Sequence, residues 1–222
     1  MSDLLDTIEI ETAPNPMASI IWLHGLGADG NDFVPIVREL DLAGARPIRF
    51  VFPHAPMRAV TINNGYVMRA WYDVTFDGLD RRPDARGIVA SQTAIEALLA
   101  REKARGIASD RIVLAGFSQG GAITLQAGLR HGGALAGLMV LSSYLPLPET
   151  LAAEAAPANA QTPIFMAHGT DDPVINIELA RRSRALLAEQ GYRVEWHEYP
   201  MPHSVCLEEI GEISRWLQQV LK

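Results

Sequence analysis

Ser118 lies in the segment Gly116-Phe117-Ser118-Gln119-Gly120-Gly121, directly after the apolar run 112–115. A serine on a sharp turn from a buried strand into a helix, with glycine two places before and two places after, is typical of a nucleophile elbow. The glycines leave room where side chains at positions 116 and 120 would collide with neighbouring backbone. The strand before the motif and the alanine-rich helical pattern after it favour a nucleophile over an incidental serine.

A serine hydroxyl is a poor nucleophile unless a base accepts its proton, and that base needs a group that holds its tautomer. In hydrolases with this elbow the order along the chain is serine, then an acid, then histidine. After Ser118 the chain has only two aspartates, Asp171 and Asp172, both in the loop after the apolar run 164–167. We expect one of them to serve catalysis and the other to make a turn or cap the next helix. Their adjacent positions do not decide which.

Two histidines follow this acidic loop. His197 lies inside a strand pattern, which indicates a structural or surface role, whereas His203 lies in a proline-flanked turn between the last strand and the last helix. A turn can carry the ring over the edge of the sheet, so we predict His203 as the base. His24 and His168 each end a strand but come too early in the chain order, and we expect them to shape or line loops.

An acyl-transfer site also needs hydrogen-bond donors for the oxyanion. The backbone N–H of Gln119, the residue after the nucleophile, is one expected donor. A glycine-rich loop after the early strand 19–23 supplies the other, and the N–H of Leu26 is the best candidate. This loop contains Gly25-x-Gly27-x-x-Gly30, but no acidic residue follows the next strand, 48–52, so we do not expect a dinucleotide site.

The elements that position these residues are strands alternating with helices. Such alternation predicts a mostly parallel sheet with helices on both faces. A half-exposed edge strand is expected at 7–12, and a short helix at 32–40. A long irregular insert spans 53–87, with a hairpin turn at Asn63-Asn64-Gly65. The further expected elements are strands at 48–52, 138–141, 164–167 and 194–199, and helices at 87–104, 119–130, 177–190 and 206–221.

The bulk properties narrow the class of protein. The 222 residues and 48% hydrophobic content predict one domain over 1–222, and the net charge of −7 argues against nucleic acid as a partner. No apolar run is long enough to span a membrane, and residues 1–6 are acidic, so we expect a cytoplasmic protein. The single cysteine, Cys206, excludes an internal disulfide. No clustered ligand spacing indicates a metal site.

Several segments resemble those of the bacterial carboxylesterases that are grouped with acyl-protein thioesterases and small phospholipase/carboxylesterase proteins. The resembling segments are 23–27 (Leu-His-Gly-Leu-Gly), 52–56 (Phe-Pro-His-Ala-Pro), 71–73 (Trp-Tyr-Asp), 116–121 (Gly-Phe-Ser-Gln-Gly-Gly), 168–169 with 172–174 (His-Gly and Asp-Pro-Val), and His203. They follow the family's order over most of the chain. Where many members have a further acid, this chain has Thr170.

The resemblance implies an α/β-hydrolase fold without a large cap domain. It implies a catalytic triad of Ser118, Asp172 and His203, because the family's acid is the one before proline. Substrate contacts are expected from Leu26, Trp71 and Val174, with no cofactor or metal. Members are often dimers, which makes a homodimer a candidate assembly.

Two classes of function are then compatible with the sequence. The first is a serine hydrolase that cleaves esters of short to medium acyl chains, with acyl-protein thioesterase or lysophospholipase activity as alternatives for the same triad. The second is a hydrolase fold that only binds a small apolar ligand. For the hydrolase, the expected substrate is a small-molecule or lipid-like acyl ester. The insert 53–87, rather than the elbow, is expected to decide its acyl length.

Overall fold

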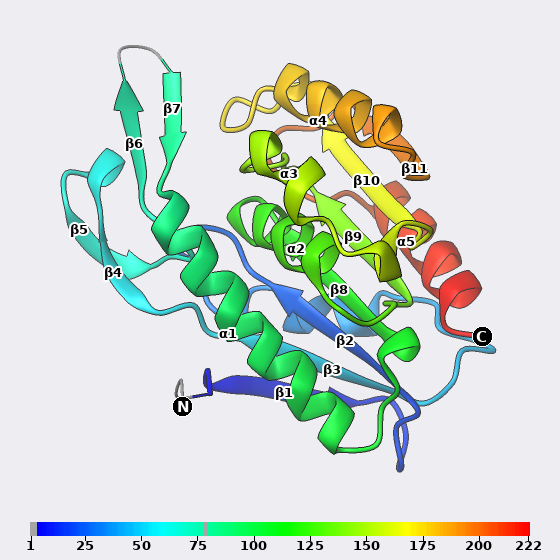
Figure 1. Ribbon diagram of the computed structural model, residues 1–222. Helices are drawn as coiled ribbons and strands as arrows, with labels where there is room; N and C mark the ends of the chain where they lie inside the picture. The colour runs from blue at the N-terminus through cyan, green and yellow to red at the C-terminus, as the bar shows by residue number, and fades with distance from the viewer. Residues whose placement is uncertain (1–3, 78–79) are drawn as a thin grey trace.

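The computed structural model describes residues 4–77 and 80–222, so half of the acidic N-terminal segment and the tip of the predicted insert lie outside it. Its centre is a seven-stranded sheet with the order β1-β3-β2-β8-β9-β10-β11 (Figure 1). These strands are β1 Thr7–Glu11, β2 Ala18–Leu23, β3 Ile48–Pro53, β8 Ile112–Phe117, β9 Gly137–Leu141, β10 Ile164–Gly169 and β11 Val194–Tyr199. Neighbouring strands run parallel, except that the edge strand β1 is antiparallel to β3. The mostly parallel sheet is confirmed.

Helices cover both faces of the sheet, as Figure 1 shows. The helices are α1 Ala85–Ala104, α2 Gln119–Arg130, α3 Pro148–Glu154, α4 Ile177–Glu189 and α5 Leu207–Val220. Side chains of α1 to α4 share one buried cluster with the sheet, and those of α5 share the other. In the described part of the chain, no helix has the length and the apolar character that crossing a bilayer requires.

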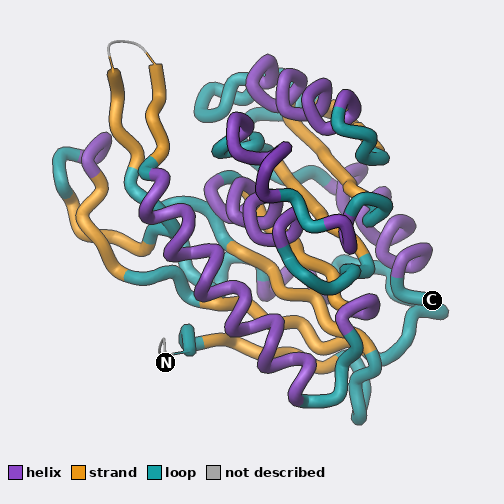
Figure 2. The backbone as a smooth tube through the Cα atoms, viewed as in Figure 1, coloured by secondary structure: helices purple, strands orange, loops and turns teal. Residues whose placement is uncertain are grey.

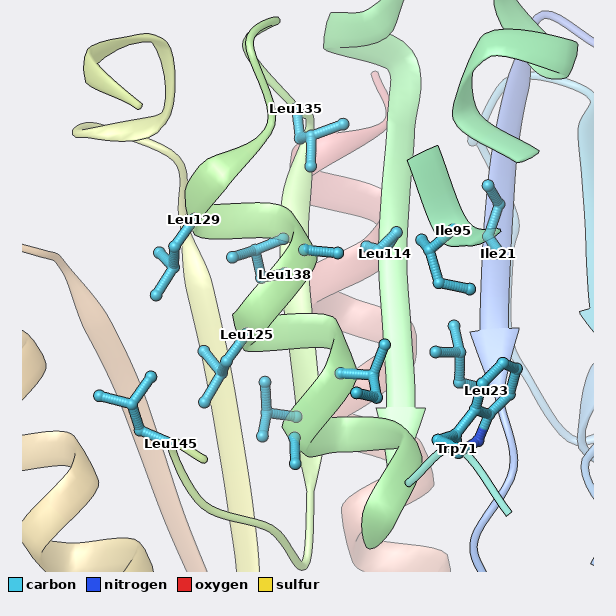
Figure 3. Close-up of a cluster of buried hydrophobic side chains, with 14 of the residues drawn as sticks. Ile21, Leu23, Trp71, Ile95, Leu114, Leu125, Leu129, Leu135, Leu138 and Leu145 are labelled. Atoms are coloured by element: carbon cyan, nitrogen blue, oxygen red, sulfur yellow. The ribbon is translucent and has the colours of Figure 1, made fainter. Parts of the chain in front are cut away.

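Strand β2 shows how the sequence specifies both faces. Its six residues are all buried, as in a central parallel strand. Ile21 and Leu23 point to the cluster under α1 and α2, whereas Ile20 and Trp22 point to the cluster under α5. Figure 3 shows the first of these clusters, with Leu23 beside Trp71 at the end of the strand. The side-chain period of two therefore explains why a continuous apolar run was needed here.

The segment between β3 and α1 is more regular than predicted. It forms two hairpins outside the main sheet: β4 Met57–Val60 with β5 Tyr66–Arg69, and β6 Val74–Asp77 with β7 Asp80–Pro83 (Figure 2). The predicted turn lies between β4 and β5, where Asn64 (φ 55°) and Gly65 (φ 74°) take the left-handed conformation. The sequence pattern did not predict two successive hairpins, because each of their strands is only four residues long.

The helix expected at 32–40 is instead a 3₁₀ turn, Val34–Arg38. Its bonds span three residues, as in Ile36 N–H to Phe33 O at 3.2 Å and Glu39 N–H to Ile36 O at 2.9 Å. Short connectors commonly take this tighter form, since few hydrogen bonds reward an α-helical turn. The turn covers the sheet face that it shares with α5.

Candidate active site

Ser118 connects the end of β8 to the start of α2 in a strained backbone conformation, with φ 54° and ψ −121°. Such conformations cost on the order of 1–3 kcal/mol and persist only where the surroundings hold them. The Ser118 N–H donates to Leu141 O at 2.9 Å, and the Ser143 hydroxyl donates to Ser118 O at 2.6 Å. A side chain at Gly120 would place its Cβ 2.4 Å from Leu23 O, so only glycine fits against β2 there.

Asp172 and His203 form a close pair at the carboxyl ends of β10 and β11. Asp172 Oδ2 lies 2.6 Å from His203 Nδ1, and Asp172 Oδ1 accepts the N–H groups of Val174 and Ile175 at 2.8 Å each. The carboxylate can only accept, so Nδ1 carries the ring proton and Nε2 is left as an acceptor. This is the tautomer that a general base requires.

His203 reaches towards the nucleophile elbow. Its ring centroid lies 4.7 Å from that of Phe117, the residue before Ser118. The Asp172 side chain is fully buried, whereas the His203 side chain is 16% exposed, so the His203 ring lies on the open side of the pair. The loops that follow β8, β10 and β11 meet at the carboxyl end of the sheet, because these strands are parallel. The sequence-predicted Ser118, Asp172 and His203 therefore lie in one region.

The other histidines have structural contacts. His24 Nε2 accepts the Ala55 N–H at 3.0 Å, and burial lowers the pKa of His24 to about 4. His168 Nε2 lies 2.8 Å from Ile175 O, so this nitrogen carries a proton, and it lies 3.3 Å from Asp172 Oδ2. Burial also lowers the pKa of His168. Both rings are neutral donors or acceptors that shape the loops around the site.

The two predicted oxyanion donors come from the loop after β2 and from the residue after Ser118. A Cβ on Gly25 would approach the Ser118 Cβ to 3.4 Å, so the loop after β2 packs directly on the nucleophile. Gly27 donates its N–H to Arg69 O at 2.9 Å and is thus committed elsewhere. Within the described residues, the N–H groups of Leu26 and Gln119 have no hydrogen-bond acceptor. They are available to a ligand.

A small apolar pocket opens beside Ser118. Its cavity volume is about 40 Å³, which is small compared with typical ligand pockets. The pocket is lined by Leu26, Ile62, Tyr72, Val74, Ser118, Gln119, Tyr144, Val174 and Ile175. Tyr72 and Tyr144 place their hydroxyl oxygens 3.0 Å apart. Of the three expected substrate contacts, Leu26 and Val174 line this pocket.

Trp71, the third expected contact, does not line the pocket. Its side chain is fully buried in the core, and its indole N–H donates to His24 O at 2.9 Å. The neighbouring Tyr72 faces the pocket instead. Aromatic composition alone could not separate the two, because consecutive side chains point in different directions. Ile62, Val74, Tyr144 and Ile175 were not anticipated, since they come from four separate segments.

One cluster with metal-ligand chemistry lies away from this pocket. Ligand atoms of Glu195, His197 and Glu212 are all within 4.8 Å of one another. Sequence spacing did not show it, because β11 and α5 bring these residues together. Their charges are already engaged: His197 Nε2 lies 2.9 Å from Glu195 Oε1, and Glu212 is paired with Arg215.

Comparison with known proteins agrees with this geometry. Residues 6–221 match the family model described as Phospholipase/Carboxylesterase. Acyl-protein thioesterase 1 of Neurospora crassa is 43% identical over 219 residues, covering 92% of this chain and 87% of the relative. The carboxylesterase SOBER1 of Arabidopsis thaliana is 33% identical over 207 residues, covering 91% and 90%.

Solved structures show the same similarity. The crystal structure of Zea mays acyl-protein thioesterase 2 superposes with a TM-score of 0.86 at 30% identity, covering 98% of this chain and 99% of that one. These relatives are fungal and plant proteins, so they do not support the bacterial grouping that the motifs suggested. Because the family model matches almost the whole chain and the relatives are similar over nearly their full length, the chain belongs to the phospholipase/carboxylesterase family.

Proposed function

We propose that this protein is a serine hydrolase that cleaves carboxylic esters of short to medium acyl chains. Ser118 acts as nucleophile, His203 as general base and Asp172 as the group that orients His203. The observation that carries the proposal is the 2.6 Å contact between Asp172 and His203, whose ring packs beside the strained Ser118 elbow. This arrangement supplies an activated nucleophile without a cofactor.

The reaction follows from the positions of these groups. His203 Nε2 takes the proton of the Ser118 hydroxyl as the oxygen attacks the acyl carbon. The carbonyl oxygen becomes an oxyanion, which the N–H groups of Leu26 and Gln119 bind. His203 then gives its proton to the leaving alcohol, and an acyl-enzyme remains on Ser118. Water, deprotonated by His203, attacks the acyl-enzyme and releases the acid.

The acyl chain occupies the pocket beside Ser118. Its apolar wall of Leu26, Ile62, Val74 and Val174 suits a hydrocarbon chain, and its small volume favours short to medium lengths. Val174 is 47% exposed and lies at the mouth. The leaving group then faces solvent on this side, which leaves room for alcohols of varied size.

Thioesters are the second candidate substrates, because several relatives are named acyl-protein thioesterases. A thiolate leaves with little help from a general acid, so the same residues serve both reactions. A lysophospholipid presents a similar acyl ester and is a third candidate. Rates for matched esters, thioesters and lysophospholipids of equal acyl length separate these substrates.

Replacing Ser118 with alanine tests the function. We expect kcat for p-nitrophenyl butyrate to fall by on the order of a million-fold, since removal of a triad serine has that effect. A fluorophosphonate probe is expected to label Ser118 in the unaltered protein. The control is Ser109→Ala, because Ser109 lies before the start of β8, at the opposite end of this strand from Ser118. Wild-type activity in the Ser118 variant contradicts the proposal. Absence of labelling favours the alternative of a fold that only binds an apolar ligand.

We also propose that residues 1–222 form one domain, supported by a sheet whose strands come from Thr7 to Tyr199 and by α5 packing back onto it. A homodimer and a cytoplasmic location remain our predictions from the sequence.

Exposed Tyr66 and Val67 on the β4–β5 hairpin offer an apolar surface that a second copy could cover. Sedimentation at several concentrations tests the dimer. The acidic net charge of −7 supports our exclusion of nucleic acid as a partner.

A further inference from the structure

The Gln119 side chain has a contact that is separate from the oxyanion. Its Oε1 accepts the Trp71 N–H at 2.7 Å, and its Nε2 donates to Tyr72 O at 2.7 Å. All three residues are buried, with Gln119 only 5% exposed. Both ends of one amide thus hold two consecutive residues of the insert between β3 and α1. Breaking the contact leaves two buried backbone groups unpaired.

Trp71 is held from several further directions. Its indole N–H donates to His24 O in the oxyanion loop, and its carbonyl accepts the Ser91 hydroxyl of α1. Two residues earlier, Arg69 O accepts the Gly27 N–H at 2.9 Å. The insert is therefore hydrogen-bonded to the oxyanion loop, to α1 and, through Gln119, to the start of α2. Of these links, the one made by Gln119 is the only one that comes from the residue directly after Ser118.

The held segment carries one side of the acyl pocket. Tyr72 and Val74 line the pocket, and so does Ile62 from the turn between β4 and β5. The Asp73 carboxylate connects these parts, because it accepts the Thr61 N–H at 2.8 Å and the Thr61 hydroxyl at 2.6 Å. A shift of residues 71–74 relative to Ser118 therefore moves three walls of the pocket together.

We propose that the Gln119 side chain is a positioning residue that sets the separation between Ser118 and the insert walls of the pocket, and thereby selects the acyl length. The proposal rests on the proposed function, in which acyl chains enter this pocket. Within one residue, the backbone N–H binds the oxyanion while the side-chain amide holds the pocket wall. Gln119 also lines the pocket, so the elbow contributes to acyl selectivity both directly and through the segment that it holds.

Replacing Gln119 with methionine tests this role, since methionine keeps the length of the side chain and lacks both amide groups. We expect the insert to move away from the elbow and the pocket to widen. The ratio of kcat/KM for p-nitrophenyl octanoate to that for the butyrate is expected to rise about threefold or more, because each methylene then finds more room. Loss of all activity in Ser118→Ala tests the proposed function, whereas a changed ratio in an active enzyme tests the positioning role.

The matched control is Gln126→Met on the same helix. Gln126 is also buried, but its Nε2 donates to Gln92 Oε1 at 3.0 Å, and it does not line the pocket. We expect this control to lower the melting temperature without changing the selectivity ratio. A wild-type ratio in Gln119→Met overturns the proposal, as does an equal change of ratio in the control.

A second variant weakens the attachment of the same segment at a residue outside the elbow. Ser91→Ala removes only the hydroxyl that binds Trp71 O. We expect it to raise the octanoate-to-butyrate ratio in the same direction by a smaller factor. If Gln119→Met does not fold, an unchanged ratio in Ser91→Ala overturns the proposal, and a raised ratio supports it.

Discussion

At the scale of single residues, Asp171 and Asp172 show how two adjacent, identical side chains acquire different chemistry. Asp172 is buried and places one oxygen on His203 and the other on two backbone N–H groups. Asp171 is exposed, and within the described residues its carboxylate accepts a hydrogen bond only from the Thr170 hydroxyl, at 3.4 Å. Reasoning from the residues left these two acids open, and the resemblance favoured Asp172, which is the one that contacts His203. Its role as the catalytic acid stays a prediction.

This contrast predicts unequal effects of the same substitution. In Asp172→Asn, the amide can donate to His203 Nδ1, which moves the ring proton to Nε2 and removes the base. We expect kcat to fall by on the order of ten-thousand-fold. Steady-state hydrolysis of p-nitrophenyl butyrate measures it, and Asp171→Asn is the control, with activity near wild type. Similar losses in both variants would contradict the assignment of the acid.

At the scale of elements, an ion-pair cluster joins the edge of the sheet to α1. Glu102 on α1 is fully buried, with its carboxylate 2.9 Å from Arg49 Nη1 on β3 and 3.0 Å from Arg105 Nη1. The Arg49 side chain is only 9% exposed and also pairs with Glu11 of β1 at 3.0 Å. These charges lie at the end of the sheet opposite the proposed site, because Arg49 is near the start of β3.

Removing the buried acid is therefore expected to affect stability and not chemistry. In Glu102→Ala, the buried Arg49 charge loses its buried partner and, among the described residues, keeps only the partly exposed Glu9 and Glu11. The free energy of unfolding is expected to fall by about 3–5 kcal/mol. Urea denaturation measures it. The control Glu11→Ala, on a side chain that is 41% exposed, is expected to cost at most about 1 kcal/mol. A large loss of kcat in folded Glu102→Ala would contradict the separation of this cluster from the site.

The elements themselves were predicted to different degrees. The buried strands and long helices follow from periodicity. β10 lies where an apolar run predicted it, and β11 has the bounds predicted for the last strand, 194–199. The insert was described as irregular, because its four-residue strands carry too little periodic signal and depend on pairing with each other. The same insert supplies Ile62, Tyr72 and Val74, so the least predictable part of the chain also lines the pocket that we propose for the acyl chain.

At the scale of the whole molecule, two buried groups respond to pH in opposite directions. Burial lowers the pKa of His24 to about 4 and raises the pKa of Glu209 to about 8. In the unfolded chain His24 takes up a proton near pH 6.5, whereas in the folded chain it stays neutral until about pH 4. The folded state therefore loses stability as pH falls from about 6.5 towards 4. The folded chain keeps the Glu209 proton that the unfolded chain releases near pH 4.5. Stability therefore falls as pH rises from about 4.5 to 8.

Glu209→Gln isolates the second effect, because glutamine stays neutral. We expect the variant to unfold at a higher temperature than wild type at pH 8.5, with the difference disappearing at pH 4. One pKa unit corresponds to about 1.4 kcal/mol, so the gain amounts to a few kcal/mol at most. Thermal unfolding across this range measures it, and exposed Glu208→Gln is the control. A difference that does not depend on pH would show that packing, and not ionisation, is responsible.

The sequence by itself determined the class of fold, and it predicted the nucleophile and the order of the triad, because these depend on local features. Buried strands need continuous apolar runs, and the elbow needs glycine where a side chain would strike the backbone of Leu23. The tertiary structure alone decided which aspartate pairs with His203, and it decided that Tyr72, and not Trp71, faces the pocket. Only the tertiary structure shows that Gln119 holds the insert. Each of these depends on the direction of one side chain relative to a segment far away in the chain, and that direction is set by packing between elements.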